Sequence, residues 1–299
     1  MYYLLAILAG VCISTMVSLN GELTASYGAY GAAAIVHAVG VIFALILCRS
    51  RKEHFHLKSK VPLWVYCGGA VGVFTTLFNN YAFGQISMTS IVAMGLLGQS
   101  IASVLFDHFG FFGIEKRKIH KSAIIGYIAA LIGVIVMLDK SASGSVLAII
   151  LTFLAGCNVV LSRTINSKLS LQTSPLIGSL INHAVGLPIC IIFFLLLQKS
   201  FVITNISVNP WKYLGGTLGV MGVLLFNITV PRISAFRLTL LSFTGQIFTG
   251  IIIDMIIGTE QSIRTILGGL IVAVGLTANM VFEQWQSKKN AALPADTSL

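Results

Sequence analysis

The stretch His37-Ala38-Val39-Gly40 returns later in the chain as His183-Ala184-Val185-Gly186. Each copy lies inside a long apolar run, where an ionisable side chain is costly unless it is paired or faces water. The same four residues do not recur in such matched surroundings by accident. The repetition therefore predicts that the chain consists of two related halves.

The similarity of the halves extends beyond the two tetrapeptides. A shift of 146 residues aligns Leu5–Leu47 with Leu151–Phe193 without a gap, and 12 of the 43 pairs are identical. A shift of 147 residues aligns Pro62–Asp107 with Asn209–Asp254, with 13 identities in 46 pairs. The duplication thus covers most of the chain.

The composition indicates a membrane protein. The chain has 299 residues, of which 56% are hydrophobic and 9% charged, and its mean hydropathy is +0.93. Soluble domains carry about 25% charged residues, so the chain is not a soluble protein with one large core. The excess of 19 basic over 9 acidic residues lies in short connections between apolar runs, which indicates membrane orientation and not a nucleic-acid partner.

Ten apolar runs are long enough to cross a bilayer, and each should be an α-helix because lipid leaves no partner for unpaired backbone groups. The predicted spans are 2–20, 29–49, 61–83, 87–107, 120–139, 144–163, 175–197, 211–230, 235–257 and 262–282. The predicted units are a first five-helix repeat over 1–141, a second over 142–285 and a disordered cytoplasmic tail over 286–299.

The basic residues predict the orientation. With the N-terminus in the cytoplasm, 15 of the 19 bases fall on the inner side, and both termini are cytoplasmic. The inner set is Arg49, Arg51, Lys52, Lys58, Lys60, Lys116, Arg117, Lys118, Lys121, Arg163, Lys168, Arg232, Arg237, Lys288 and Lys289. Five spans is an odd number, so the second repeat enters the membrane upside down. The expected fold is an all-α integral membrane protein of two inverted-topology repeats, with a site at their interface.

Several stretches resemble a known family. Leu8-Ala9-Gly10 with Asn20-Gly21, His37-Ala38-Val39-Gly40, and Gly98-Gln99-Ser100 with Asp107-His108-Phe109-Gly110 are similar to the YdcZ-like branch of the drug/metabolite transporter superfamily. Members of that branch occur as single five-helix units and as fused pairs. The resemblance implies a multi-pass exporter of small molecules in the bacterial inner membrane.

His37 and His183 are the first candidates for the transport path. An imidazole titrates near pH 6.5, so it can accept a proton on one side of a membrane and release it on the other. The alternative is a histidine that fastens a helix pair beside small residues such as Ala38 and Gly40. Because one repeat is inverted, we expect His37 nearer the outside and His183 nearer the inside, on opposite sides of a cavity.

The other matched polar residues are candidates of the same kind. They are the pairs Gln99/Gln246, Asn20/Asn166, Asn80/Asn227 and Asp107/Asp254, together with the unmatched Glu22. Each glutamine precedes its aspartate by eight residues, slightly over two turns, so the two side chains share a helix face. The aspartates are alternatively interfacial anchors, and Glu22 is alternatively an exposed loop residue in a chain that breaks near Asn20 and Gly21.

Small residues in the third span of each repeat predict close helix packing, at Gly68-x-x-x-Gly72 and Gly215-x-x-x-Gly219. The sequence contains no phosphate-binding loop, nucleophile elbow or clustered metal-ligand motif, so we expect no enzyme activity, cofactor or metal. The expected function is a secondary active transporter of a small molecule, coupled to protons and acting as a monomer or homodimer. A passive channel or a membrane subunit of a larger complex is the alternative.

Overall fold

A computed structural model describes most of the chain. The described residues are 1–83, 85–86, 88–113, 116, 123–137, 145–198, 209–257 and 263–291. Within these ranges the regular structure is helical, apart from one isolated bridge between Phe83 and Ile86. The prediction of an all-α protein is confirmed.

The helices follow the predicted spans closely. They are α1 (Tyr2–Ser50), α2 (Gly68–Ala82), α3 (Met88–Phe109), α4 (Ala123–Met137), α5 (Val146–Gln172), α6 (Pro175–Leu197), α7 (Gly215–Thr229), α8 (Ala235–Ile257) and α9 (Ile263–Ala291), with 3-10 turns η1 (Leu63–Tyr66), η2 (Phe111–Gly113) and η4 (Pro210–Leu214). Among the described residues, five helical segments are long and apolar enough to cross a membrane: Tyr2–Ser50, Ser90–Phe109, Val146–Gln172, Pro175–Leu197 and Ala235–Ile253.

α1 contains a sharp break that separates it into two helical segments. Its backbone is helical throughout except at Gly28, where φ is 74° and ψ is 167°. A positive φ of this kind is available to glycine without a steric penalty. The side-chain amide of Gln198 bridges the break, because its Oε1 accepts the N–H of Gly31 and its Nε2 donates to the carbonyl of Tyr27. The predicted loop after Asn20 is therefore wrong, and the helix runs on to the break.

Two further boundaries differ from the prediction. α5 continues to Gln172, well beyond the predicted end at residue 163, because the polar residues that suggested a connection are buried between helices. α9 continues to Ala291, so residues 286–291 of the predicted tail are helical, while 292–299 lie outside the described residues.

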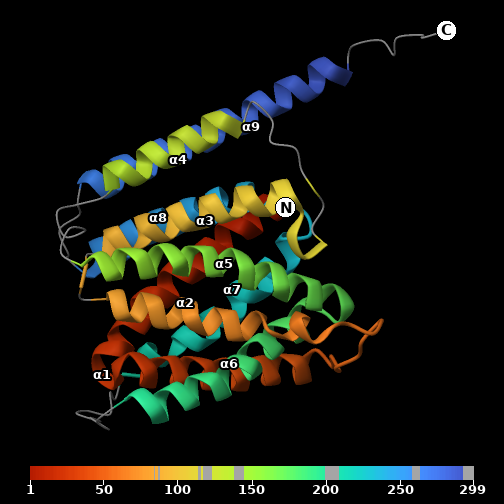
Figure 1. Ribbon diagram of the computed structural model, residues 1–299, viewed down its shortest axis with the longest axis vertical. Coiled ribbons are helices and arrows are strands. Elements are labelled where there is room, and N and C mark those ends of the chain that lie inside the picture. The colour runs from red at the N-terminus through yellow and green to blue at the C-terminus, as the bar shows by residue number, and fades with distance from the viewer. Residues whose placement is uncertain are drawn as a thin grey trace.

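The helices run roughly parallel and are stacked along the long axis of the molecule (Figure 1). α4 and α9 form a pair at one end, and α3 and α8 come next. α6 and the second segment of α1 lie together at the opposite end, with α2, α5, α7 and the first segment of α1 between. Each of these outer pairs joins a helix to its equivalent in the other repeat.

Glycines allow the two halves to approach each other at backbone distance, and they do so reciprocally. A Cβ built at Gly98 would overlap the carbonyl oxygen of Phe153, and one built at the equivalent Gly245 would overlap the carbonyl oxygen of Ile7. Phe153 and Ile7 are themselves equivalent positions. Two further sets of equivalent glycines behave in the same way. A Cβ at Gly10 would overlap the carbonyl oxygen of Ser242, and one at Gly156 would overlap that of Gly95. A Cβ at Gly69 would overlap the carbonyl oxygen of Asn182, and one at Gly216 would overlap that of Val36. Such reciprocal contacts are what a two-fold relation between the repeats produces.

The substitution Gly98→Ala should destabilise the protein by roughly 1–3 kcal/mol, because the new methyl group meets backbone of α5 that cannot move away locally. Gly95→Ala, one turn earlier on the same helix, is the matched control, since its nearest neighbouring atom is 4.0 Å from the added Cβ. The control should be neutral or stabilising, because alanine favours a helix by about 1 kcal/mol over glycine. Thermal unfolding of the solubilised variants measures both effects, and equal melting of the two would contradict this account.

Candidate functional site

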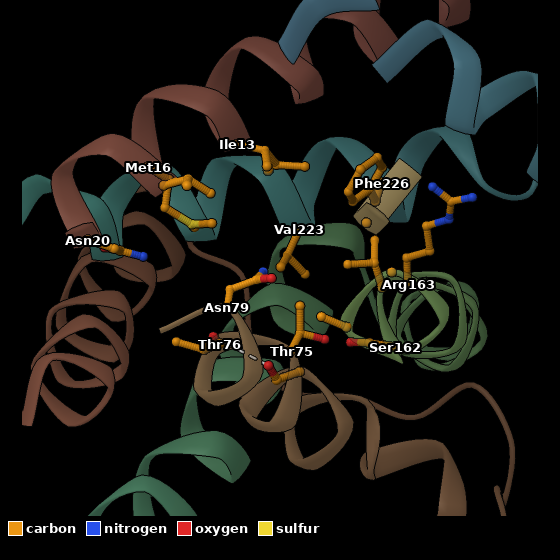
Figure 2. A pocket seen from close by; sticks show the side chains of 18 of the residues that line it. Ile13, Met16, Asn20, Thr75, Thr76, Asn79, Ser162, Arg163, Val223 and Phe226 are labelled. Carbon is orange, nitrogen blue, oxygen red and sulfur yellow. Dashed lines mark hydrogen bonds between the residues drawn. The ribbon is translucent and has the colours of Figure 1, made fainter. Parts of the chain in front are cut away.

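A cavity of about 200 Å³ lies between the two halves (Figure 2). Residues of α1, α2 and α3 line it from the first half, and residues of α5, α6, α7 and α8 line it from the second. The cavity is partly open, and its mixed apolar and polar lining is typical of small-molecule sites.

The lining is built almost entirely from equivalent positions of the two repeats. The eleven matched pairs are Ile13/Val159, Met16/Ser162, Val17/Arg163, Asn20/Asn166, Val36/Asn182, His37/His183, Gly72/Gly219, Thr75/Gly222, Thr76/Val223, Asn79/Phe226 and Gln99/Gln246. The unmatched lining residues are Ile91, Val92, Gly95, Ala155 and Gly156, all from α3 and α5. The cavity therefore lies on the pseudo-two-fold axis and extends from it between α3 and α5.

The two repeated histidines meet in this cavity. Their ring centroids are 5.4 Å apart and both side chains are buried. The expectation that His37 and His183 lie on opposite sides of a cavity is wrong. Each lies about eight residues into its helical segment, or about 12 Å at 1.5 Å per residue, so the two occupy equivalent positions along equivalent segments. An axis between these positions brings equivalent residues together.

The spacing of the repeated tetrapeptide follows from this meeting. The His37 ring lies where a Cβ of Gly186 would be, and the His183 ring lies where a Cβ of Gly40 would be. His and Gly are three residues apart, about one turn, so in two antiparallel helices the imidazole of each packs against the glycine of the other. The space that each glycine leaves for the opposite ring is called its notch. The predicted fastening of the helix pair is thus present, and both rings also line the cavity.

The two imidazoles differ in their hydrogen bonds. Nδ1 of His183 lies 3.0 Å from the carbonyl oxygen of Ser179. A carbonyl only accepts, so this contact places a proton on Nδ1 and leaves Nε2 of a neutral ring as an acceptor. Nδ1 of His37 makes no hydrogen bond to any described residue. The pair therefore has unused capacity to take up a proton or bond to a polar solute.

Asn20 and Asn166 both line the cavity and repeat the reciprocal packing. Asn20 lies against Gly215, and Asn166 lies against the equivalent Gly68, which confirms the predicted close packing at these glycines. Nδ2 of Asn166 donates to Oδ1 of Asn182 at 2.7 Å, whereas Oδ1 of Asn20 has no partner among the described residues. A buried acceptor left unpaired costs about 1–3 kcal/mol, and this oxygen lies against the backbone of Gly215.

The remaining amide candidates separate into two groups. Gln99 and Gln246 line the cavity, as a transport-path assignment requires. Asn80 and Asn227 do not line it. Nδ2 of Asn80 donates to the carbonyl of Ala29 and Nδ2 of Asn227 to that of Pro175, each at 3.0 Å, so these two asparagines tie equivalent helix starts in place.

Asp107 lies outside the cavity lining and joins two helices. Its Oδ1 and Oδ2 accept the backbone N–H groups of Ala235 and Phe236 at 2.9 and 3.0 Å. These are orphan donors at the N-terminus of α8, where a carboxylate is favourable. The side chain of Asp254 lies outside the described part of the structure. The anchor interpretation therefore describes Asp107, whose partners are backbone N–H groups of α8.

Glu22 is exposed on α1 and lies 3.8 Å from Nζ of Lys212. It does not line the cavity. A pair of this kind contributes little to stability. Its position on a helix, and not in a loop, follows from the late break at Gly28.

Arg163 is a cavity-lining residue that the sequence does not single out. By sequence it counts as an inner-connection base, yet it lies on α5 with a buried side chain and contributes to the cavity lining. Its Nη2 donates to Ser103 Oγ, Thr239 Oγ1 and the carbonyl of Ala235. The signal available in the sequence was the departure from the repeat, because Val17 occupies the equivalent position.

Comparison with known families gives two matches to one family, over residues 1–136 and 147–280. That family is described as "Putative inner membrane exporter, YdcZ". The chain belongs to the YdcZ family. The family description is that of a transporter and not an enzyme, and with the long apolar helices it makes this YdcZ-family chain a membrane-embedded protein.

Comparison with solved structures supports the fold of the YdcZ-family chain. One structure, described only as "Crystal structure of protein", superposes with a TM-score of 0.71 at 12% sequence identity. The superposition covers 94% of this chain and 96% of the other. A search of curated proteins finds no match.

The histidine notches predict a reciprocal rescue. Gly40→Ala should lower stability by roughly 1–3 kcal/mol, because its methyl group overlaps the His183 ring. Adding His183→Ala should recover most of that loss, whereas adding His37→Ala should not. A double-mutant cycle on apparent melting temperature measures the coupling. Equal rescue by both histidine variants would show that the pairing of notch and ring is not the one described.

The role of Asp107 predicts a stability loss without a matched loss at Glu22. Asp107→Ala removes the acceptor of two backbone N–H groups and should destabilise by about 1.5–3 kcal/mol, the range for hydrogen bonds to charged groups. Glu22→Gln should change stability by less than about 1 kcal/mol. Thermal unfolding of both variants in the same detergent tests this difference.

Proposed function

We propose that this YdcZ-family chain is a secondary active transporter that exports a small molecule by alternating access, coupled to protons. The observation that carries the proposal is the cavity on the pseudo-two-fold axis, lined by eleven pairs of equivalent residues. Repeats that exchange conformations around such an axis expose one site to each side of the membrane in turn.

The proposed membrane arrangement is ten spans in two inverted repeats, with both termini in the cytoplasm of a bacterium. The break at Gly28 supports the count, because it divides α1 at the position equivalent to Ser174, the N-cap of α6. The reciprocal glycine contacts support a two-fold relation between the repeats. The concentration of basic residues on one side supports the orientation.

The proposed proton carriers are His37 and His183. They are buried, they line the cavity, and both rings lie next to the site where a solute binds. Among the described lining residues none is acidic, so a carboxylate carrier of the kind used by small multidrug exporters has no counterpart there.

The test is transport by purified protein in sealed proteoliposomes under an imposed pH gradient. A proton-coupled exporter accumulates its substrate above the equilibrium concentration and moves protons in return, whereas a passive facilitator only equalises concentrations. A metabolite panel with an entrapped pH-sensitive dye identifies the substrate. Absence of proton movement for every substrate that crosses the membrane would overturn the coupling.

We expect His37→Ala and His183→Ala to impair transport more than folding. Each should abolish uphill accumulation, while the protein still folds with a lowered melting temperature, because removing a buried ring leaves a void but the other contacts between the repeats remain. His108→Ala is the control, since His108 is exposed and does not line the cavity. If both variants express, melt and transport like the parent, the histidines only pack.

A further inference from the structure

The two repeats have diverged in the chemistry that they present to the cavity. Thr76 and Asn79 of α2 are polar, whereas their equivalents on α7 are Val223 and Phe226. In the helices that begin each repeat, the polar residue belongs to the second repeat instead of the first. Ser162 of α5 is polar, and its equivalent Met16 of α1 is apolar.

These differences sort into two opposite walls. α2 packs beside α5 and α6, so their polar residues lie together. α1 packs beside α7, which brings Met16 and Val223 together, next to the polar Asn20 of α1. Figure 2 shows Thr75, Thr76, Asn79 and Ser162 on one side of the pocket and Ile13, Met16, Val223 and Phe226 across from them. The cavity is therefore amphipathic across its width.

The polar wall has an unused hydrogen-bonding group. Oγ1 of Thr75 is buried and makes no hydrogen bond to any described residue. The neighbouring Thr76 differs, because its Oγ1 donates to the carbonyl of Gly72 at 3.4 Å. A buried hydroxyl without a protein partner is costly, so Thr75, a cavity-lining residue, gains a hydrogen bond if its side chain turns toward a polar solute.

The described cavity lining contains one guanidinium, Arg163, whose charge is offset by a nearby carboxylate, and no acidic residue. A cation therefore has no carboxylate partner among the described lining residues. Nη2 of Arg163 donates to three acceptors, one of which is the carbonyl of Ala235, whereas Nη1 makes no hydrogen bond to any described residue. Asp107 accepts the N–H of the same Ala235, so the two charges offset each other at the start of α8. A buried ion without a partner is strongly disfavoured.

We propose that the cavity binds an uncharged amphipathic solute, with an amide or hydroxyl group against Thr75 and Asn79 and an apolar group against Met16 and Val223. This inference specifies the substrate class of the transporter proposed above. The binding part depends on the cavity alone, so it is tested separately from transport.

A matched series of ligands tests the class. Phenylacetamide, phenylacetate and phenethylammonium share an apolar ring and differ in the charge of the polar end. Titration calorimetry on the full chain in lipid nanodiscs should show the amide binding at least ten-fold more tightly than either ion.

Equivalent positions of the repeats supply the variants. Thr75→Val removes the unpaired hydroxyl at almost constant volume and should weaken the amide about three- to ten-fold, the loss of one hydrogen bond. Val223→Thr places a hydroxyl on the apolar wall and should weaken it as well. Thr277→Val, on the exposed side of α9, is the control and should leave binding unchanged. Melting curves of all three separate binding loss from misfolding.

Each outcome decides the inference. Tighter binding of the amide, lost on Thr75→Val, supports it. Preference for phenylacetate would assign the site to anions through Arg163, and preference for phenethylammonium would assign it to cations; both overturn the uncharged class. Absence of binding by all three compounds overturns it too. Amide binding without proton-driven accumulation in proteoliposomes would instead overturn the proposed transport and leave the binding site in place.

Discussion

The reciprocal seating of two imidazoles in two glycine notches is the contact on which this structure depends. His37 against Gly186 and His183 against Gly40 fix how closely α1 and α6 cross, and at which residues. The crossing lies on the pseudo-two-fold axis, so it also sets the relation of the remaining helices. Packing in a membrane has no hydrophobic force between helices to rely on, which makes close approach at small residues the principal source of helix association. Both imidazoles also line the cavity beside this crossing.

The arrangement separates residues that hold helices from residues that face the cavity. Backbone groups at helix ends are hydrogen-bonded by the side chains of Asp107, Asn80 and Asn227. Gln99, Gln246 and Asn20 line the cavity. Polar side chains inside apolar spans therefore fall into two groups in this chain. One group bonds to backbone atoms at helix ends, and the other lines the cavity.

Much of the fold was predictable from the sequence, because apolar length and internal repetition are local signals. The spans 175–197 and 235–257 coincide with α6 and α8 at both ends. The contacts between repeats were not predictable in the same way. The inverted arrangement of the predicted spans suggested that His37 and His183 lie at opposite depths. In the structure, the two rings are in contact. Arg163 was misassigned because a base near a span end resembles a connection residue, and only the tertiary contacts with Ser103 and Thr239 show its burial.

The unequal walls of the cavity have an energetic consequence for a fused chain. In a dimer of identical units, exchanging the two conformations returns an equivalent molecule, so inward-facing and outward-facing forms have the same free energy. Here Thr76 and Val223 occupy equivalent positions and differ in polarity, as do Asn79 and Phe226. In the proposed alternating-access cycle, the exchange then produces a different molecule. Gene fusion thus allows selection to set which side of the membrane the empty carrier faces at rest.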